Sequence, residues 1–120
     1  MFDLTGKIAL ITGASRGLGY AIANGFSKQG ATVILNGRTS KTLEKSAEKL
    51  RVHGYPVHIS SFDVTDSSAI KSAISNIEAT IGPIDILVNN AGIQHRQLLS
   101  ELQEDDWRRV LDTNLTAPFL

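Results

Sequence analysis

Residues 8–19 of the chain, IALITGASRGLG, join an apolar run directly to a cluster of three glycines. The run Ile8–Ile11 is typical of a buried strand, and the spacing Gly-x-x-x-Gly-x-Gly begins at Gly13, after the single residue Thr12. A strand that ends in such a turn and continues into a helix directs backbone N–H groups and the positive end of the helix dipole toward one point. We therefore predict that an anion, the pyrophosphate of a dinucleotide, binds at this turn.

The three glycines have different predicted tasks. Gly13 allows the tight turn, Gly17 lets the main chain approach the phosphates, and Gly19 lets the helix pack close to the strand. The alternative is a glycine-rich loop without a ligand. The cofactor-binding candidates in this segment are Gly13, Ser15, Arg16, Gly17, Leu18 and Gly19.

Strand and helix patterns alternate along the rest of the chain. Strands are expected over residues 8–11, 32–35, 56–63 and 84–88. The segments between them carry apolar stripes at helical spacing, formed by Leu18, Ile22 and Phe26, by Leu43, Ala47 and Leu50, and by Ile70, Ala73, Ile74, Ile77 and Ile81. This alternation predicts an α/β fold, a Rossmann-like doubly wound parallel sheet in the order 3-2-1-4, with the crevice between strands one and four. Because the sequence ends one predicted helix after strand four, we expect Ile86-Leu87-Val88 to be an unpaired sheet edge.

Composition indicates an ordinary globular domain rather than a nucleic-acid or membrane protein. The 120 residues carry 12 basic and 12 acidic side chains and no cysteine. No signal peptide or membrane span is recognisable, so we expect a cytoplasmic protein that binds neither nucleic acid nor membrane. The three histidines, His53, His58 and His95, lack the spacing of metal ligands, and no metal site is expected.

The turn after the second strand, Asn36-Gly37-Arg38, bears on the choice of cofactor. Proteins that bind NAD place a carboxylate about 20 residues after the glycines, where it accepts hydrogen bonds from ribose hydroxyls. Here no carboxylate is present, and Arg38, with Arg16 in the glycine loop, could pair with a ribose phosphate. The pattern favours NADP, and the alternative is that both arginines are solvated surface residues.

Two further loops follow strands three and four at the same edge of the sheet. Asn89-Asn90-Ala91-Gly92 follows strand four, and its asparagines could tie neighbouring strands or meet a ribose, while Asn90, Ala91 and Gly92 are cofactor candidates. Asp63 and Val64 are placed to meet the adenine, with Asp63 accepting from its amine. The alternatives are a polar turn after strand four and a helix cap near Asp63, and for Asp66 we favour the cap.

The combination of Thr12-Gly13-x-x-x-Gly17-x-Gly19, Asp63, Asn89-Asn90-Ala91-Gly92 and Asn114 resembles the short-chain dehydrogenase/reductase family over the whole chain. The resemblance implies an NADP(H)-dependent oxidoreductase that acts on a small carbonyl compound and forms a homodimer or homotetramer. Within the family, residues 35–38, 62–66 and 82–94 are similar to the gluconate 5-dehydrogenase group, which interconverts gluconate and 5-ketogluconate. Acyl-carrier-protein ketoreductases share nearly all the cofactor motifs and are the alternative.

The family also uses a Tyr-x-x-x-Lys pair and a Ser that lie well past the Asn89-Asn90-Ala91-Gly92 motif, and the sequence ends at Leu120 without them. Neither Tyr20 nor Tyr55 is followed by Lys four residues later. In the family, the Tyr hydroxyl protonates the carbonyl oxygen as hydride arrives, the Lys lowers its pKa, and Ser holds the oxygen. The resemblance therefore implies that residues 1–120 are the NADP(H)-binding half-domain, that the catalytic half follows residue 120, and that the 120-residue chain alone is inactive. A non-catalytic dinucleotide-binding fragment is the other reading.

The last segment holds one catalytic and two substrate candidates. A helix is expected through Trp107, Val110, Leu111, Leu115 and Phe119, and Pro118 would free the Asn114 carbonyl to hold water. The family's asparagine binds such a water on the proton route to the lysine, so Asn114 is the catalytic candidate, the alternative being an ordinary helix kink. Arg96 could meet a sugar-acid carboxylate and Gln94 its hydroxyls, unless both belong to a solvated loop.

Overall fold

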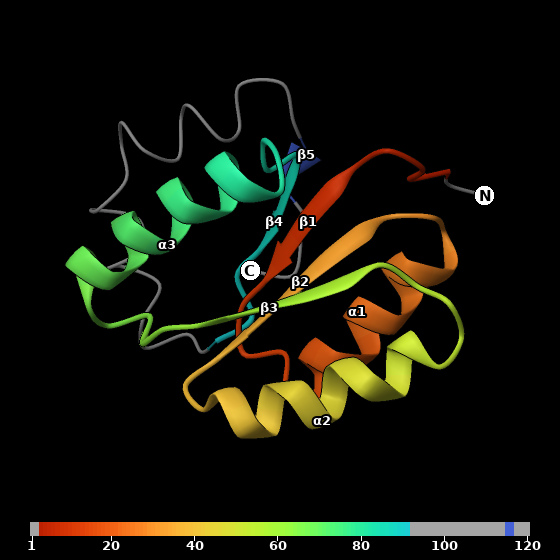
Figure 1. Cartoon of the computed structure of the whole chain (residues 1–120), viewed down its shortest axis with the longest axis horizontal. Coiled ribbons are helices and arrows are strands. Elements are labelled where there is room, and N and C mark those ends of the chain that lie inside the picture. Colours follow the sequence, from red (N-terminus) through yellow and green to blue (C-terminus); the bar gives the residue numbers. More distant parts are fainter. Residues whose placement is uncertain (1–2, 92–114, 117–120) are drawn as a thin grey trace.

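The computed structural model of the chain describes residues 3–91 and 115–116. In chain order its elements are β1 (Ile8–Ile11), α1 (Gly17–Lys28), β2 (Thr32–Gly37), α2 (Ser40–Arg51), β3 (Val57–Ser61), α3 (Ser67–Thr80), β4 (Ile86–Val88) and β5 (Leu115–Thr116) (Figure 1). The strands are parallel and lie in the order β3-β2-β1-β4-β5. The predicted α/β class and the order 3-2-1-4 are confirmed.

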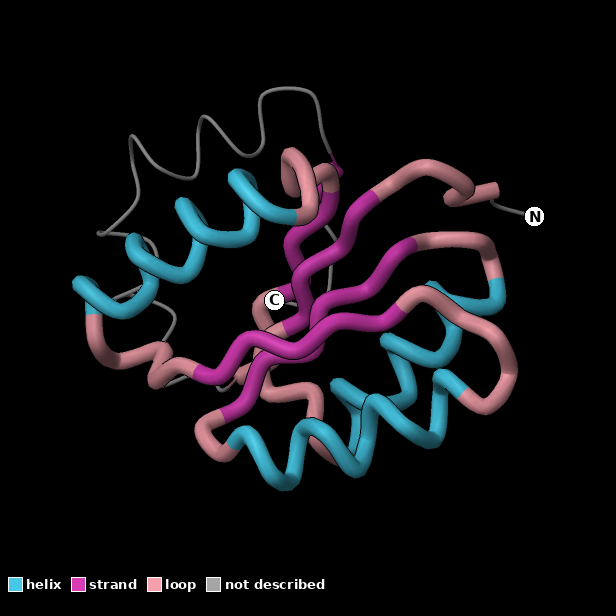
Figure 2. Tube along the Cα trace, in the orientation of Figure 1, coloured by secondary structure: helices cyan, strands magenta, loops and turns pink. Residues whose placement is uncertain are grey.

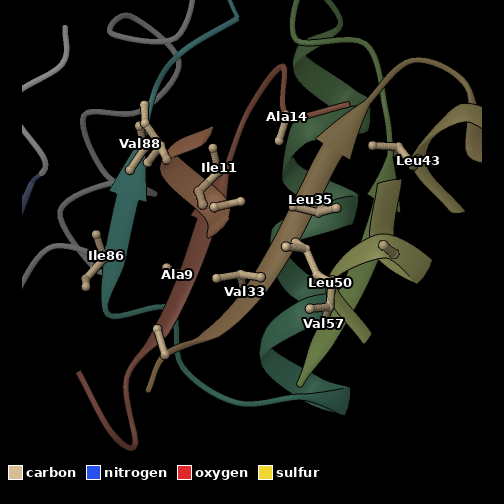
Figure 3. Packing of buried hydrophobic residues seen from close by; sticks show 14 residues of the cluster. Ala9, Ile11, Ala14, Val33, Leu35, Leu43, Leu50, Val57, Ile86 and Val88 are labelled. Atoms are coloured by element: carbon tan, nitrogen blue, oxygen red, sulfur yellow. The ribbon is translucent and has the colours of Figure 1, made fainter. Parts of the chain in front are cut away.

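The sheet is covered on both faces. Figure 2 shows α1 and α2 on one side of the strands and α3 on the other. Because successive side chains of a strand point to opposite faces, β1 directs Ala9 and Ile11 into the cluster under α1 and α2, and Leu10 into the cluster under α3. The same alternation runs through β2 and β4. Figure 3 shows the cluster that lies under α1 and α2. Because both faces of the sheet are buried, the strand sequences are continuous apolar runs.

The apolar residues at helical spacing lie on the buried face of α2 and of α3. Leu43, Ala47 and Leu50 are buried along α2, and the isoleucines of α3 fill the opposite cluster. Asp66 begins α3 as its N-cap, where its side chain accepts a hydrogen bond from the Ala69 N–H at 3.1 Å. The capping interpretation of Asp66 is therefore confirmed.

Leu18 differs from its prediction. We expected it to begin the buried stripe of the first helix, but its side chain is 62% exposed. Leu18 lies in the first turn of α1, where its neighbour Gly19 is the residue that packs against the turn after β1. Ile22, one turn later, is the first buried member of the stripe, and Phe26 packs partly buried against the same cluster.

Some element boundaries also differ from the expected ones. The β2 strand continues to Gly37, because Asn36 and Gly37 pair with the end of β3. The β4 strand is shorter than predicted and begins at Ile86. The residue before it, Asp85, bonds to Ile8 twice: its N–H donates to the Ile8 carbonyl at 2.8 Å, and its carboxylate accepts from the Ile8 N–H at 2.9 Å.

The segment expected as the last helix also differs where it is described. Leu115 and Thr116 form β5, which pairs with β4. The prediction of an unpaired β4 edge was therefore wrong, and so was that of a helix at these two residues. An open strand edge offers backbone hydrogen bonds, and these override a local helical pattern. Asn114 and the other residues of that expected helix lie outside the described residues. Within the described ranges, no helix has the length and apolar character needed to cross a membrane.

The outer edge of β3 is covered by an arginine. The Pro56 carbonyl accepts from Val33 in β2, so the next carbonyl, that of Val57, points away from the sheet. The guanidinium of Arg51 donates to this oxygen from Nε at 3.1 Å and from Nη2 at 2.9 Å. Arg51 also pairs with Glu44 and Glu48 of its own helix. One of the backbone groups that an added strand would bind is thereby occupied.

We expect Arg51→Ala to promote association through the β3 edge. The substitution frees the Val57 carbonyl, and because a backbone hydrogen bond contributes about 1 kcal/mol net, self-association should strengthen about fivefold. Sedimentation velocity over a concentration series measures this effect. Lys45→Ala removes one charge from the exposed side of the same helix and is the matched control. Equal behaviour of the two variants would contradict the role of Arg51.

Candidate cofactor-binding site

A cleft of about 730 Å³ opens at the carboxyl ends of the strands. Cavities of about 300 to 1,000 Å³ are usual for small-molecule sites, and in open parallel sheets they lie at this edge. The cleft takes its walls from the turn after β1 and the loops after β2, β3 and β4. Its lining residues are Gly13, Ser15, Arg16, Gly17, Asn36, Gly37, Arg38, Thr39, Thr42, Phe62, Asp63, Val64, Asn90 and Ala91.

Most of the cofactor candidates come together in this cleft. The turn after β1 contributes Gly13, Ser15, Arg16 and Gly17, and the other loops contribute Arg38, Asp63, Val64, Asn90 and Ala91. Among the described candidates, Leu18 and Gly19 do not line it. Gly92, Gln94, Arg96 and Asn114 lie outside the described residues. In the described part of the chain, no group of three or more His, Cys, Asp or Glu side chains is placed to hold a metal ion.

Gly19 lies where helix α1, the turn after β1 and the Asn90 side chain converge. A Cβ atom there would lie 2.3 Å from the Gly13 carbonyl oxygen, 2.6 Å from Asn90 Nδ2 and 2.9 Å from the Ala14 Cα. Real Cβ atoms do not approach other heavy atoms this closely, so the helix can pack against the turn only because residue 19 has no side chain. This is the close approach predicted for Gly19.

Gly17 has a different environment. Its φ of +62° is in the left-handed region that favours glycine, and no described atom lies within 4 Å of the position of a Cβ there. The main chain at Gly17 is therefore open to the cleft. The helix α1 begins at this residue, and within the described residues no side chain caps it and no acidic residue lies in its first turn. The first N–H groups of a helix have no intrahelical partner, so this end suits an anion.

Thr12 ties the ends of β1 and β4 together. Its side-chain oxygen accepts hydrogen bonds from the Asn90 N–H at 2.8 Å and from the Ala91 N–H at 3.0 Å. Its own backbone N–H donates to the Val88 carbonyl at 3.0 Å. Asn90 completes the link, because Nδ2 donates to the Gly13 carbonyl at 3.1 Å. The expectation that these asparagines tie neighbouring strands is thus confirmed for Asn90.

Asn36 joins the glycine turn to the far wall of the cleft. Its buried side chain accepts from the Gly13 N–H at 3.2 Å, and Nδ2 donates to the carbonyls of Ser60 and Phe62, each at 3.1 Å. Sequence reasoning used residue 36 only for its lack of a carboxylate and missed this bridge. The available signal was an amide at the end of an otherwise apolar strand. Ser46 was missed as well, and its hydroxyl donates to the Ser15 carbonyl from α2.

The rim of the cleft carries opposite charges. The Arg38 side chain is 79% exposed, and its Nη2 lies 3.3 Å from Asp63 Oδ2. Of the residues that line the cleft, only Asp63 bears a carboxylate, while Arg16 and Arg38 bear guanidinium groups. Asp63 Oδ1 also accepts from the Thr65 N–H at 2.9 Å and hydroxyl at 2.7 Å. The cap of α3 is Asp66 rather than Asp63, and Asp63 lines the cleft as predicted while its Oδ1 holds the turn that precedes the helix.

A family of known proteins shares this arrangement. The sequence model described as short chain dehydrogenase matches residues 7–120. The chain belongs to the short-chain dehydrogenase family, as the glycine spacing and the Asn89-Asn90-Ala91-Gly92 segment predicted.

Individual relatives and a solved structure agree with this membership. Gluconate 5-dehydrogenase of Gluconobacter oxydans is 44% identical over 119 residues, which cover 99% of this chain and 46% of that protein. A 3-oxoacyl-[acyl-carrier-protein] reductase of Salmonella typhimurium is 41% identical over 114 residues, 95% of this chain and 46% of that protein. L-sorbose reductase of Gluconobacter frateurii, solved with NADPH and L-sorbose, matches with a TM-score of 0.74 and 31% identity, covering 94% of this chain and 48% of that chain. The chain spans about half the length of these proteins.

We expect Gly19→Ala to destabilise the fold. The added methyl group must displace the Gly13 carbonyl or the Asn90 amide, and overpacking of this kind costs about 1 to 3 kcal/mol. Urea denaturation measures the change in the free energy of unfolding.

Gly25→Ala is the matched control on the same helix. Apart from the backbone of α1 itself, no atom of the described residues lies within 4 Å of the added Cβ at this exposed position, so the substitution should stabilise α1 by about 0.5 to 1 kcal/mol. If both variants were stabilised, the close contact at Gly19 would not limit the packing of α1.

Proposed function

We propose that the protein is an NADP(H)-dependent oxidoreductase that interconverts gluconate and 5-ketogluconate. One observation supports it above all: the uncapped start of α1 and the open main chain at Gly17 face a cleft whose rim carries Arg16 and Arg38. The identity with gluconate 5-dehydrogenase supports the substrate.

The cleft fits a dinucleotide along its length. Gly13, Ser15 and Gly17 would hold the pyrophosphate at the start of α1. Asp63 and Val64 would meet the adenine, and Asn90 and Ala91 the opposite end of the cofactor, with Leu18 and Gly19 completing the turn beneath it. A nicotinamide bound there supplies or accepts a hydride.

The end of β2 favours a phosphorylated ribose over a free one. No carboxylate stands there to accept from the ribose hydroxyls: the side-chain oxygen of Asn36 is turned to the Gly13 N–H, and residue 37 has no side chain. The exposed guanidinium of Arg38 instead offers parallel donors that suit a phosphate. That L-sorbose reductase was solved with NADPH agrees with this assignment.

Catalysis and substrate binding rest on residues outside the described part of the chain. Asn114 would hold the water of the proton route, while Gln94 and Arg96 would bind the hydroxyls and carboxylate of the sugar acid, and Gly92 would adjoin the cofactor. We place the tyrosine, lysine and serine of the family in a catalytic half after residue 120, so that residues 1–120 alone are inactive. The protein would act in the cytoplasm on a small molecule, as a homodimer or homotetramer.

An assay of the intact protein tests the substrate. We expect NADPH oxidation with 5-ketogluconate at enzyme-like rates, because a carboxylate and hydroxyls on the substrate would match Arg96 and Gln94. A 3-oxoacyl thioester is the competing substrate, and spectrophotometry at 340 nm follows both reactions. Faster turnover of the thioester would favour the acyl-carrier-protein reductase alternative, and no turnover of either would contradict both.

We expect Arg38→Leu to reduce selectivity for NADP. Charge-assisted hydrogen bonds contribute about 1.5 to 3 kcal/mol each, so the ratio of NADPH to NADH affinity should fall roughly tenfold or more. Fluorescence titration of both cofactors measures the ratio. Lys41→Leu removes an exposed charge close by on α2, outside the cleft, and should leave the ratio unchanged. An unaltered ratio in Arg38→Leu would exclude phosphate binding by Arg38.

A further inference from the structure

Asp63 is held in place by its own loop. One carboxylate oxygen, Oδ1, accepts two hydrogen bonds from Thr65, and the other, Oδ2, faces Nη2 of Arg38 at 3.3 Å. The carboxylate therefore has a fixed direction, set by the turn that precedes α3.

The arginine is tethered to the same wall through its main chain. The Ser61 hydroxyl donates to the Arg38 carbonyl at 3.1 Å, which ties the turn after β2 to the end of β3. The guanidinium then bridges from this turn to Asp63, and both residues line the cleft. The group assigned to the ribose phosphate thus already has an anionic partner.

We propose that Asp63 sets the strength of the preference for NADP by competing with the ribose phosphate for Arg38. The inference rests on the proposed role of Arg38. The Asp63 contact uses Nη2 of the guanidinium, so a ribose phosphate of NADP that binds this nitrogen displaces the carboxylate, whereas binding of NAD leaves the Arg38–Asp63 pair intact. Asp63 therefore lowers the affinity for NADP and does not impose this cost on NAD.

Exposure and charge decide the outcome of this competition. Arg38 is 79% exposed and Asp63 is 37% exposed, and ion pairs this accessible are weak. A phosphate monoester carries a charge of about −1.5 to −2 at neutral pH, which is more negative than that of a carboxylate. The guanidinium therefore binds the phosphate in preference to Asp63. The competition reduces the preference without reversing it.

Any contact between Asp63 and the adenine is common to both cofactors. A substitution at Asp63 that weakens an adenine contact would lower both affinities by the same factor. The ratio of NADPH to NADH affinity removes this shared term and reports only the exchange at Arg38.

The test is Asp63→Asn in the intact protein, with NADPH and NADH titrated by fluorescence. The asparagine keeps an oxygen for Thr65 but loses the charge that holds Arg38. We expect the affinity ratio to rise about two- to fivefold, the range of a weak exposed pair. The rise should shrink between 0.05 and about 0.5 M salt, because screening weakens exposed pairs.

Two controls isolate the pair from general electrostatics. Asp66→Asn removes an equal charge three residues away, at a side chain that caps α3 and does not line the cleft, and it should leave the ratio unchanged. In an Arg38→Leu background, Asp63→Asn should also leave the ratio unchanged, because the residue it acts through is gone. Thermal unfolding checks that each variant is folded.

The possible results separate this inference from the proposed function. An unchanged or lower ratio in Asp63→Asn overturns the inference, and a lower ratio would mean that Asp63 positions Arg38 for the phosphate. A rise that persists without Arg38 overturns it as well. If the unchanged protein does not prefer NADPH to NADH, the proposed cofactor is wrong and the inference falls with it.

Discussion

The contact between residue 19 and the turn after β1 is the constraint on which the site depends. With no side chain at Gly19, the first turn of α1 approaches the Gly13 carbonyl, and Asn90 reaches the same oxygen from the end of β4. One carbonyl therefore brings together a helix and two strands that are distant in sequence. The direction of the α1 N-terminus follows from this packing, and that direction is what suits the cleft to an anion.

The sheet and its order could be predicted from the sequence, because burial on both faces leaves a strong local signature. The runs at Ile8–Ile11 and Ile86–Val88 lack polar residues, and the stripe at Leu43, Ala47 and Leu50 repeats at helical spacing. Leu18 fits the same spacing but is exposed, since periodicity does not reveal where a helix extends past the sheet.

The candidate site was predictable where backbone geometry requires a residue type, as at Gly13 and Gly19. The site was not predictable where a polar side chain forms hydrogen bonds with the main chain of another element. Asn36 and Ser46 are such cases, because their partners lie on separate elements. The pairing of Arg38 with Asp63 likewise depends on the parallel register of β2 and β3, which places their ends side by side.

The Asn36 amide bridges the glycine turn and the loop after β3, so these two walls of the cleft are mechanically linked. Local opening at the pyrophosphate end would break the bond to Gly13 and expose an amide that also holds Ser60 and Phe62. Loss of the Gly13 bond would leave the buried Asn36 oxygen without that donor, and this cost opposes movement of the glycine turn away from the loop after β3. A ligand bound at the glycine turn therefore also acts, through Asn36, on the position of the loop after β3.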